Sequence, residues 1–106
     1  MPLERLCFTF ELYPGQEAEY QRRHDEIWPE LVREIERSGF RNYSLFRRDR
    51  QVIAYMECHP DAASAFAALA GSDPVARWAE WFGDVIVSMT DANGDLMLLD
   101  EVWHLD

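Results

Sequence analysis

Two polar side chains one helical turn apart, Tyr20 and His24, are the first candidates for chemistry in this sequence. Residues four positions apart meet on one face of a helix. At 100° per residue, both fall on the apolar stripe that carries Ile27, Leu31 and Ile35. A histidine can give or take a proton near neutral pH, and a tyrosine hydroxyl can donate a hydrogen bond. The spacing alone favours a packed core pair, and it is also compatible with acid–base work in a pocket.

Further aromatic candidates come from two later segments. Tyr43 alternates with Leu45 in a strand-like run, which favours a packed tyrosine when the residue is taken alone. Trp78, Trp81 and Phe82 share one helical face, which is ordinarily a core stripe. An exposed aromatic face can also stack on the apolar C–H face of a sugar ring, so a sugar site is a second interpretation.

Other kinds of site have little support. No HxH, HExxH or CxxC spacing occurs, and the 5 glycines are scattered, so we expect no metal, no phosphate loop and no cofactor. The formal net charge of -10 argues against nucleic-acid and anionic-lipid partners. This charge is more compatible with a neutral or cationic small-molecule ligand. The chain does not open with a basic region followed by an apolar run, which favours a cytoplasmic protein.

The length of 106 residues predicts one domain, residues 1–106. Strands are expected where apolar residues alternate, at 3–12, 42–48, 51–58 and 96–104, with a tight turn at 48–50 that makes the middle two a hairpin. Helices are expected where the apolar period lengthens, at 16–38, 61–69 and from about 72 to about 87.

Pro29 lies inside the first helical stretch. It lacks a backbone donor and clashes with the carbonyl of Asp25, so we expect a kink or break near Ile27–Pro29, just after His24. Gly39 follows the stretch at the position of a left-handed C-terminal cap.

The element order β-α-β-β-α-β predicts an α+β fold of the ferredoxin-like type, an antiparallel sheet with helices on one face. The expected last strand is apolar on both faces, at Leu96, Leu98 and Val102 on one and at Met97, Leu99 and Trp103 on the other. Because one short domain has too few helices to cover both faces of the sheet, we expect a homodimer.

The run EYQRRHDEIWPEL, residues 19–31, closely resembles the helix motif of the L-rhamnose mutarotase family. The resemblance continues at Asn42-Tyr43-Ser44 and Arg77-Trp78, and length and element order agree along the chain. It implies a homodimer of ferredoxin-like subunits that exchanges the α and β anomers of L-rhamnose without a cofactor.

The resemblance also implies roles for individual residues. His24 matches the catalytic histidine of the family, and Tyr20 and Tyr43 match its sugar-binding tyrosines. The tryptophan pair of the family matches Trp78 and Ala79, so this chain departs from the family at the second position. Trp81, one turn after Trp78, is a candidate for a replacement stacking surface.

Three alternatives stay open at this point. The first is a mutarotase for another 6-deoxy sugar such as L-fucose, an alternative that the departure at Ala79 keeps open. The second is a cofactor-free monooxygenase-type dimer of the same fold, since fold alone does not imply function. The third is a dimeric sugar-binding module that binds without accelerating exchange.

Overall fold

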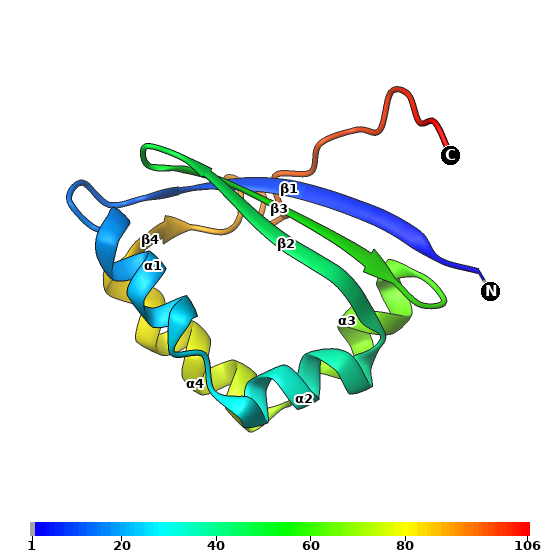
Figure 1. Cartoon of the computed structure of the whole chain (residues 1–106), viewed down its shortest axis with the longest axis horizontal. Helices are drawn as coiled ribbons and strands as arrows, with labels where there is room; N and C mark the ends of the chain where they lie inside the picture. The colour runs from blue at the N-terminus through cyan, green and yellow to red at the C-terminus, as the bar shows by residue number, and fades with distance from the viewer. Residues whose placement is uncertain (1) are drawn as a thin grey trace.

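A four-stranded antiparallel sheet with helices packed on one face makes up the computed structural model, which describes residues 2–106 (Figure 1). The elements in chain order are β1 (Glu4–Leu12), α1 (Glu17–Asp25), α2 (Pro29–Ser38), β2 (Phe40–Arg48), β3 (Gln51–Cys58), α3 (Ala62–Leu69), α4 (Asp73–Trp81), the 3₁₀ turn η1 (Phe82–Asp84) and β4 (Ile86–Ser88). None of the helices in residues 2–106 has the length and apolarity needed to cross a bilayer.

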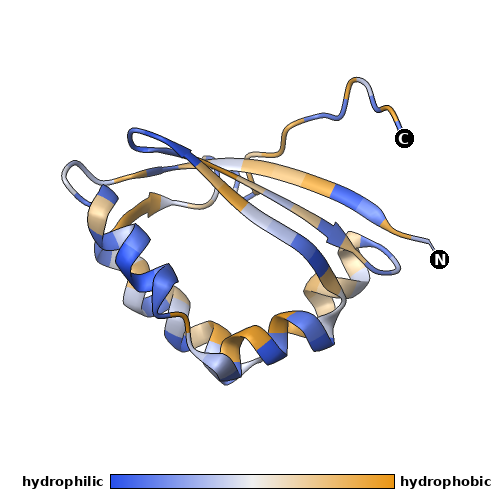
Figure 2. Cartoon of the chain, viewed as in Figure 1, coloured by the Kyte–Doolittle hydropathy of each residue, from blue (hydrophilic) through white to orange (hydrophobic). Residues whose placement is uncertain are grey.

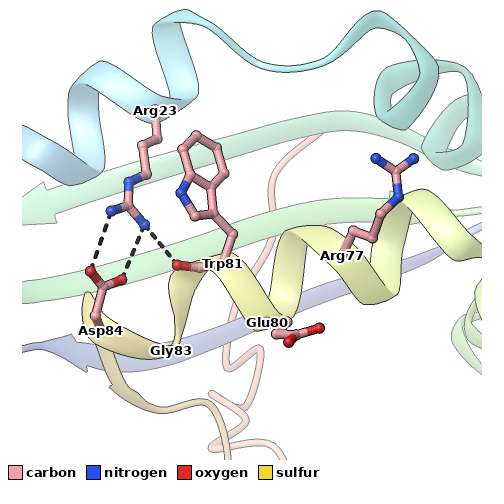
Figure 3. Close-up of a pocket in the computed structure, with 6 residues that line it drawn as sticks. All are labelled: Arg23, Arg77, Glu80, Trp81, Gly83 and Asp84. Carbon is pink, nitrogen blue, oxygen red and sulfur yellow. Dashed lines mark hydrogen bonds and ion pairs between the residues drawn. The ribbon is translucent and has the colours of Figure 1, made fainter.

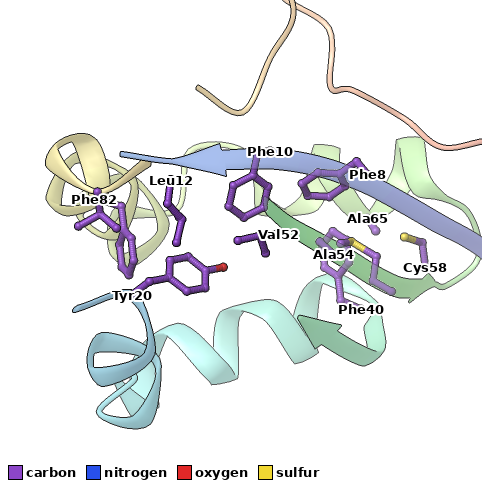
Figure 4. Close-up of a cluster of buried hydrophobic side chains, with 12 residues drawn as sticks. Phe8, Phe10, Leu12, Tyr20, Phe40, Val52, Ala54, Cys58, Ala65 and Phe82 are labelled. Atoms are coloured by element: carbon purple, nitrogen blue, oxygen red, sulfur yellow. The ribbon is translucent and has the colours of Figure 1, made fainter. Parts of the chain in front are cut away.

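The centre of the sheet is the antiparallel pair β1 and β3, in the strand order β2-β3-β1-β4. Alternate residues of β1 face the helices, and Phe8, Phe10 and Leu12 are all buried. Their partners across the pair include Ala54 and Val52, which are completely buried. Figure 4 shows these side chains meeting between the sheet and the helical layer. The period-2 pattern thus places one apolar face of the sheet under the helices.

The break expected at Pro29 is confirmed. α1 ends at Asp25, and Trp28 has extended backbone angles (φ -66°, ψ 129°) before Pro29 starts α2. Proline suits the first turn of a helix, where its missing donor would have no partner. The chain therefore changes direction just after His24.

Gly39 ends α2 in the left-handed conformation that the sequence predicts, with φ 110°. A Cβ atom at this position would lie 2.3 Å from the carbonyl oxygen of His59. The His59 N–H donates to the Gly39 carbonyl oxygen at 2.9 Å. Glycine is required here by its backbone angle and by this close approach to the end of β3.

The hairpin and α3 lie close to their predicted positions, whereas α4 is shorter than predicted. β2 begins two residues earlier than expected, and β3 has the expected bounds. The side chain of Asp61 caps α3 by accepting from Ser64 N–H at 2.7 Å. α4 ends at Trp81, well before the expected end near Val87, because the chain passes through η1 into a short strand.

The prediction of a last strand at 96–104 is wrong. The fourth strand of the sheet is β4, Ile86–Ser88, which pairs with Glu11 and Leu12 of β1. The segment after Leu96 continues this edge only briefly, through Thr9 N–H to the Met97 carbonyl at 3.1 Å and Leu99 N–H to the Cys7 carbonyl at 2.8 Å. Beyond Leu99 the chain leaves the sheet and runs past it as an irregular tail (Figure 1). Strand propensity does not suffice where the tail finds no backbone partner.

Candidate active site

A cavity of about 690 Å³ lies between the sheet and the helical layer. Its size falls within the range of roughly 300–1,000 Å³ that is common for small-molecule sites. Its walls are mainly apolar and come from the inner face of the sheet and from all four α-helices. The polar side chains on these walls are Tyr20, His24, Glu36, Arg41, Asn42, Tyr43 and Ser88. An apolar wall with a few polar groups is typical of a site for a small ligand.

His24, in the last turn of α1, is an ionisable group on the wall of this cavity. Its Nδ1 lies 2.9 Å from the carbonyl oxygen of Tyr20. A carbonyl oxygen only accepts hydrogen bonds, so Nδ1 carries the proton and donates it. In the neutral ring, Nε2 then carries the lone pair. This hydrogen bond prepares Nε2 to accept a proton.

Aromatic rings surround the His24 imidazole. Its centroid lies 4.4 Å from that of Tyr20, 5.3 Å from that of Phe82 and 5.4 Å from that of Trp78. Burial among these rings lowers the pKa of His24, and the hydrogen bond to the Tyr20 carbonyl and the Asp25 charge oppose this shift only partly. Near neutral pH the ring is therefore uncharged, as a general base requires.

Tyr20 and Tyr43 supply hydroxyl groups to the same cavity. Burial raises the pKa of Tyr20 well above its usual range, and the nearby Tyr43 raises it further. Tyr43 keeps 43% of its surface exposed as a whole residue, but burial of its phenol group raises the pKa of Tyr43 to about 12. Both hydroxyls are neutral at physiological pH, so they can donate hydrogen bonds to ligand oxygens.

A β-bulge in β2 turns Tyr43 toward the cavity. Arg41 pairs with Glu57 and Ser44 pairs with Tyr55, so two β2 residues lie opposite one residue of β3. Asn42 takes the unusual positive φ of 48° inside this bulge. Because of the extra residue, Tyr43 lines the same cavity as Phe40, three positions earlier, which a regular strand would not allow.

The helix α4 contributes Trp78 and Ala79 to the cavity wall, but not Trp81. Trp81 lies on the outer side of the helical layer, where it is 36% exposed. Its ring stacks on that of Trp28, with centroids 5.5 Å apart and planes 11° apart. The Trp81 ring contacts that of Trp78, with centroids 5.6 Å apart, but Trp81 does not line the cavity, so the geometry gives no support to a role for Trp81 in stacking on a ligand.

Sequence reasoning missed Arg23, which is only 6% exposed although it neighbours the exposed Arg22. Its guanidinium crosses from α1 to the end of α4 and donates to the carbonyl oxygen of Trp81 at 2.8 Å (Figure 3). It also donates to carboxylate oxygens of Glu19 and Asp84. Nothing in the helical period marks this arginine as buried, because its partners lie far along the chain.

The described residues 2–106 contain no group of three or more histidine, cysteine, aspartate or glutamate side chains arranged to hold a metal ion. The arrangement can instead do proton transfer, with a neutral imidazole as base and two tyrosine hydroxyls as hydrogen-bond donors. A ligand with several oxygen atoms and an apolar face fits such walls.

Comparisons with known proteins agree over nearly the whole chain. The family model described as L-rhamnose mutarotase matches residues 5–105. An L-rhamnose mutarotase of Opitutus terrae is 38% identical over 104 residues, covering 96% of this chain and 98% of that protein. One of Acidiphilium cryptum is 36% identical over 105 residues, covering 97% and 99%. The crystal structure of an L-rhamnose mutarotase from Formosa agariphila superposes with a TM-score of 0.78 at 27% identity, covering 97% of this chain and 99% of that one.

Proposed function

The chain belongs to the L-rhamnose mutarotase family, and from this premise we propose how its cavity interconverts the α and β anomers of L-rhamnose. The protein is an isomerase that acts on sugar anomers. The observation that carries the proposed mechanism is that His24 lines the cavity with its Nδ1 hydrogen-bonded to the Tyr20 carbonyl, which leaves Nε2 as the nitrogen that can accept a proton.

In the proposed reaction, Nε2 of His24 takes the proton from the anomeric hydroxyl. The bond between C1 and the ring oxygen breaks as the C1–O1 double bond forms, and the ring oxygen takes the proton back from the imidazolium. The aldehyde rotates, and the same steps in reverse close the ring on the other face. One histidine can serve both transfers because the two oxygens share C1. General acid–base catalysis of this kind contributes about 10²–10⁴-fold.

Tyr20 and Tyr43 are proposed to hold sugar hydroxyls rather than to lose protons. The raised pKa of each phenol makes the tyrosinate costly, so each remains a neutral donor throughout the cycle. Trp78 offers an apolar ring for the C–H face or the methyl group of the sugar, and Ala79 leaves space beside it. The hydroxyl groups of a 6-deoxy sugar match the tyrosine hydroxyls, and its apolar face matches the Trp78 ring.

Saturation-transfer NMR on equilibrated L-rhamnose tests this function. We expect added protein to raise the exchange rate between the two anomeric protons above the spontaneous rate, in proportion to protein concentration. L-fucose and an ordinary aldose serve as comparison sugars. Exchange of L-rhamnose at the spontaneous rate would contradict the proposal, and faster exchange of L-fucose would identify a different preferred 6-deoxy sugar.

The pH dependence of exchange follows from the lowered pKa of His24. The neutral ring is the active form, so activity should be full above this pKa and should fall as the pH falls through it. Because the shift is downward, the midpoint should lie below about 6.5, the ordinary histidine value. Protein-dependent exchange, after subtraction of the spontaneous rate at each pH, gives the profile. A loss of activity with a midpoint above the ordinary value would contradict a buried, neutral base.

The proposal includes a ferredoxin-like fold for the subunit. Its support is the chain order, in which each helical section of a βαββαβ pattern is divided into two helices, together with the strand order β2-β3-β1-β4. It also includes a cytoplasmic location, supported by the two free cysteines Cys7 and Cys58, because cytosolic proteins rarely form disulfides.

The proposal further includes a homodimer formed through the C-terminal tail. Val102, Trp103 and Leu105 are respectively 92%, 75% and 74% exposed, and the tail runs on the side of the sheet away from the helices (Figure 2). Arg5 of β1 holds the start of this tail against the sheet, because it donates hydrogen bonds to both carboxylate oxygens of Glu101, at 2.7 and 3.1 Å. Exposed apolar side chains clustered in this way are typical of an interface, and a second copy would cover them symmetrically.

The change Trp103→Glu is expected to dissociate this dimer, because it places a charge where an apolar contact is proposed. In sedimentation velocity, the wild type should have about twice the chain mass of 12.4 kDa, and the variant should have the mass of one chain. Arg37→Glu, on the exposed side of α2, is the control and should behave as the wild type. A monomeric wild type, or a dimeric Trp103→Glu variant, would contradict the proposed interface.

A further inference from the structure

We propose that Arg23 is a positioning residue for His24, because its buried guanidinium fixes the last turn of α1 to the junction of α4 and η1. This inference rests on the proposed role of His24. The three partners of Arg23 are Glu19 on its own helix, the main-chain oxygen of Trp81 and the carboxylate of Asp84. The contacts to Trp81 and Asp84 connect α1, which carries His24, with α4 and η1, which lie beside the His24 ring.

The contacts of Arg23 are short and come from several sides. Its Nε donates to Glu19 at 2.6 Å, and one terminal nitrogen donates to the Trp81 carbonyl at 2.8 Å and to Asp84 at 3.2 Å. The other terminal nitrogen reaches Asp84 at 3.4 Å. The guanidinium carbon also lies 4.5 Å above the Trp81 ring and 5.3 Å from the Phe82 ring. Hydrogen bonds in the plane of the group and rings against its face hold it in one orientation.

The location of these contacts links them to His24. The carbonyl of Trp81 belongs to the last residue of α4, at the end of the helix where the helix dipole attracts cations. The next residue, Phe82, contacts the imidazole with centroids 5.3 Å apart, and Trp78 on the same helix contacts it at 5.4 Å. Arg23 therefore holds the very end of α4 against which His24 packs.

Apart from Arg23, this part of α1 is held by ring packing, in which Tyr20 and His24 contact Phe82 and His24 also contacts Trp78. The helix ends at Asp25, one residue after His24, and the break before Pro29 separates it from α2. A helix end is among the parts of a fold that open first when a tertiary contact is removed. Without Arg23, the His24 ring would lose its fixed position relative to the cavity, and a misplacement of about 1 Å can cost about 10²-fold in rate.

The neighbouring Arg22 is a natural comparison for Arg23 within the same helix. It also bonds Glu19, at 2.6 Å, and it reaches Glu26 at 2.9 Å, but all its partners lie on or beside α1 and its side chain is 54% exposed. Such exposed ion pairs contribute little to the stability of the fold. The two adjacent arginines thus share one acidic partner and differ in whether they connect α1 to α4.

The test compares Arg23→Lys with Arg22→Lys. Lysine keeps the charge but cannot form the planar, multiple contacts of arginine. For Arg23→Lys we expect kcat for L-rhamnose exchange to fall by about 10- to 100-fold with KM within about threefold, as lost orientation predicts. The ¹⁵N shifts of the His24 ring should change from the pure Nδ1–H tautomer toward a mixture. Arg22→Lys should keep wild-type values in both measurements.

A wild-type kcat with wild-type ring shifts in folded Arg23→Lys would overturn the inference. A loss of activity that merely follows the folded fraction, with unchanged ring shifts, would also overturn it, because it would assign Arg23 a structural role alone. If Arg23→Lys does not fold, Asp84→Asn removes charge only from the exposed partner. It should lower kcat and alter the ring shifts in the same direction, and wild-type values in both would overturn the inference.

The ring shifts also separate this inference from the proposed mechanism. If His24→Ala keeps full exchange activity, the mechanism fails, while the tautomer of His24 in Arg23→Lys still reports whether Arg23 orients the ring. If His24→Ala is inactive and Arg23→Lys behaves as the wild type, the mechanism stands and the positioning role fails.

Discussion

Replacing His24 with alanine is expected to lower kcat for L-rhamnose anomer exchange by about 10²–10⁴-fold, the usual contribution of a general acid–base group. The expectation rests on the fixed Nδ1–H bond to the Tyr20 carbonyl and on the lowered pKa, which together keep Nε2 unprotonated. KM should change little, because hydrogen bonding of the sugar is assigned to Tyr20 and Tyr43. A loss confined to kcat is the mark of an interaction made in the transition state.

His104→Ala is the matched control, since His104 is exposed in the tail and bonds only carboxylates there, with Asp106 at 2.7 Å. Both variants should be compared at equal concentrations of folded protein, checked by circular dichroism. Exchange by His24→Ala at more than about a tenth of the wild-type kcat would fall outside the acid–base range and would remove His24 from the mechanism.

Phe82→Ala should have the largest effect on stability among single changes near the site, a loss of about 3–5 kcal/mol in the free energy of unfolding. Phe82 is 2% exposed. Its ring contacts those of Tyr20, His24, Trp78 and Trp81, with centroids between 4.7 and 5.8 Å apart. Truncation removes apolar contacts and leaves a cavity that these rings cannot easily fill. A loss of this size is a large share of the roughly 5–15 kcal/mol that stabilises a typical domain.

Urea unfolding followed by tryptophan fluorescence measures this loss, with an unchanged m-value as the condition for comparing midpoints. Tyr13→Ala is the control, because Tyr13 is 41% exposed in the loop after β1 and such surface changes are usually within about 0.5 kcal/mol. A loss below about 1 kcal/mol for Phe82→Ala would show that the wall of aromatic rings can collapse around the gap.

The sequence predicted the features that are decided locally. The alternation in β1 and β3, the turn between β2 and β3, the break before Pro29 and the cap at Gly39 all depend on neighbouring residues. The placement of Tyr20 and His24 on one inward face likewise follows from a spacing of four within one helix. Neighbouring residues were sufficient to predict each of these features, because backbone sterics or the spacing of apolar side chains excludes the competing conformations.

Features that depend on distant partners were not predictable in this way. Arg23 is buried because Trp81 and Asp84, about sixty residues later, accept its hydrogen bonds. Tyr43 enters the cavity through a bulge whose register is set by β3. The tail beyond Leu96 has the apolar pattern of a strand, but it finds only two backbone partners on β1. A pattern gives the preference of a segment, whereas pairing requires a neighbour in space.

The most direct test of the catalytic proposal is the ¹⁵N NMR spectrum of the His24 ring, recorded near neutral pH with and without L-rhamnose. The His24 resonances are identified as those that disappear from the spectrum of the His24→Ala variant. Our account predicts a protonated Nδ1 and an unprotonated Nε2, with the Nε2 resonance moving when the sugar binds and the Nδ1 resonance staying in place. A proton on Nε2 in the free protein, or an Nε2 resonance that ignores saturating L-rhamnose, would contradict it.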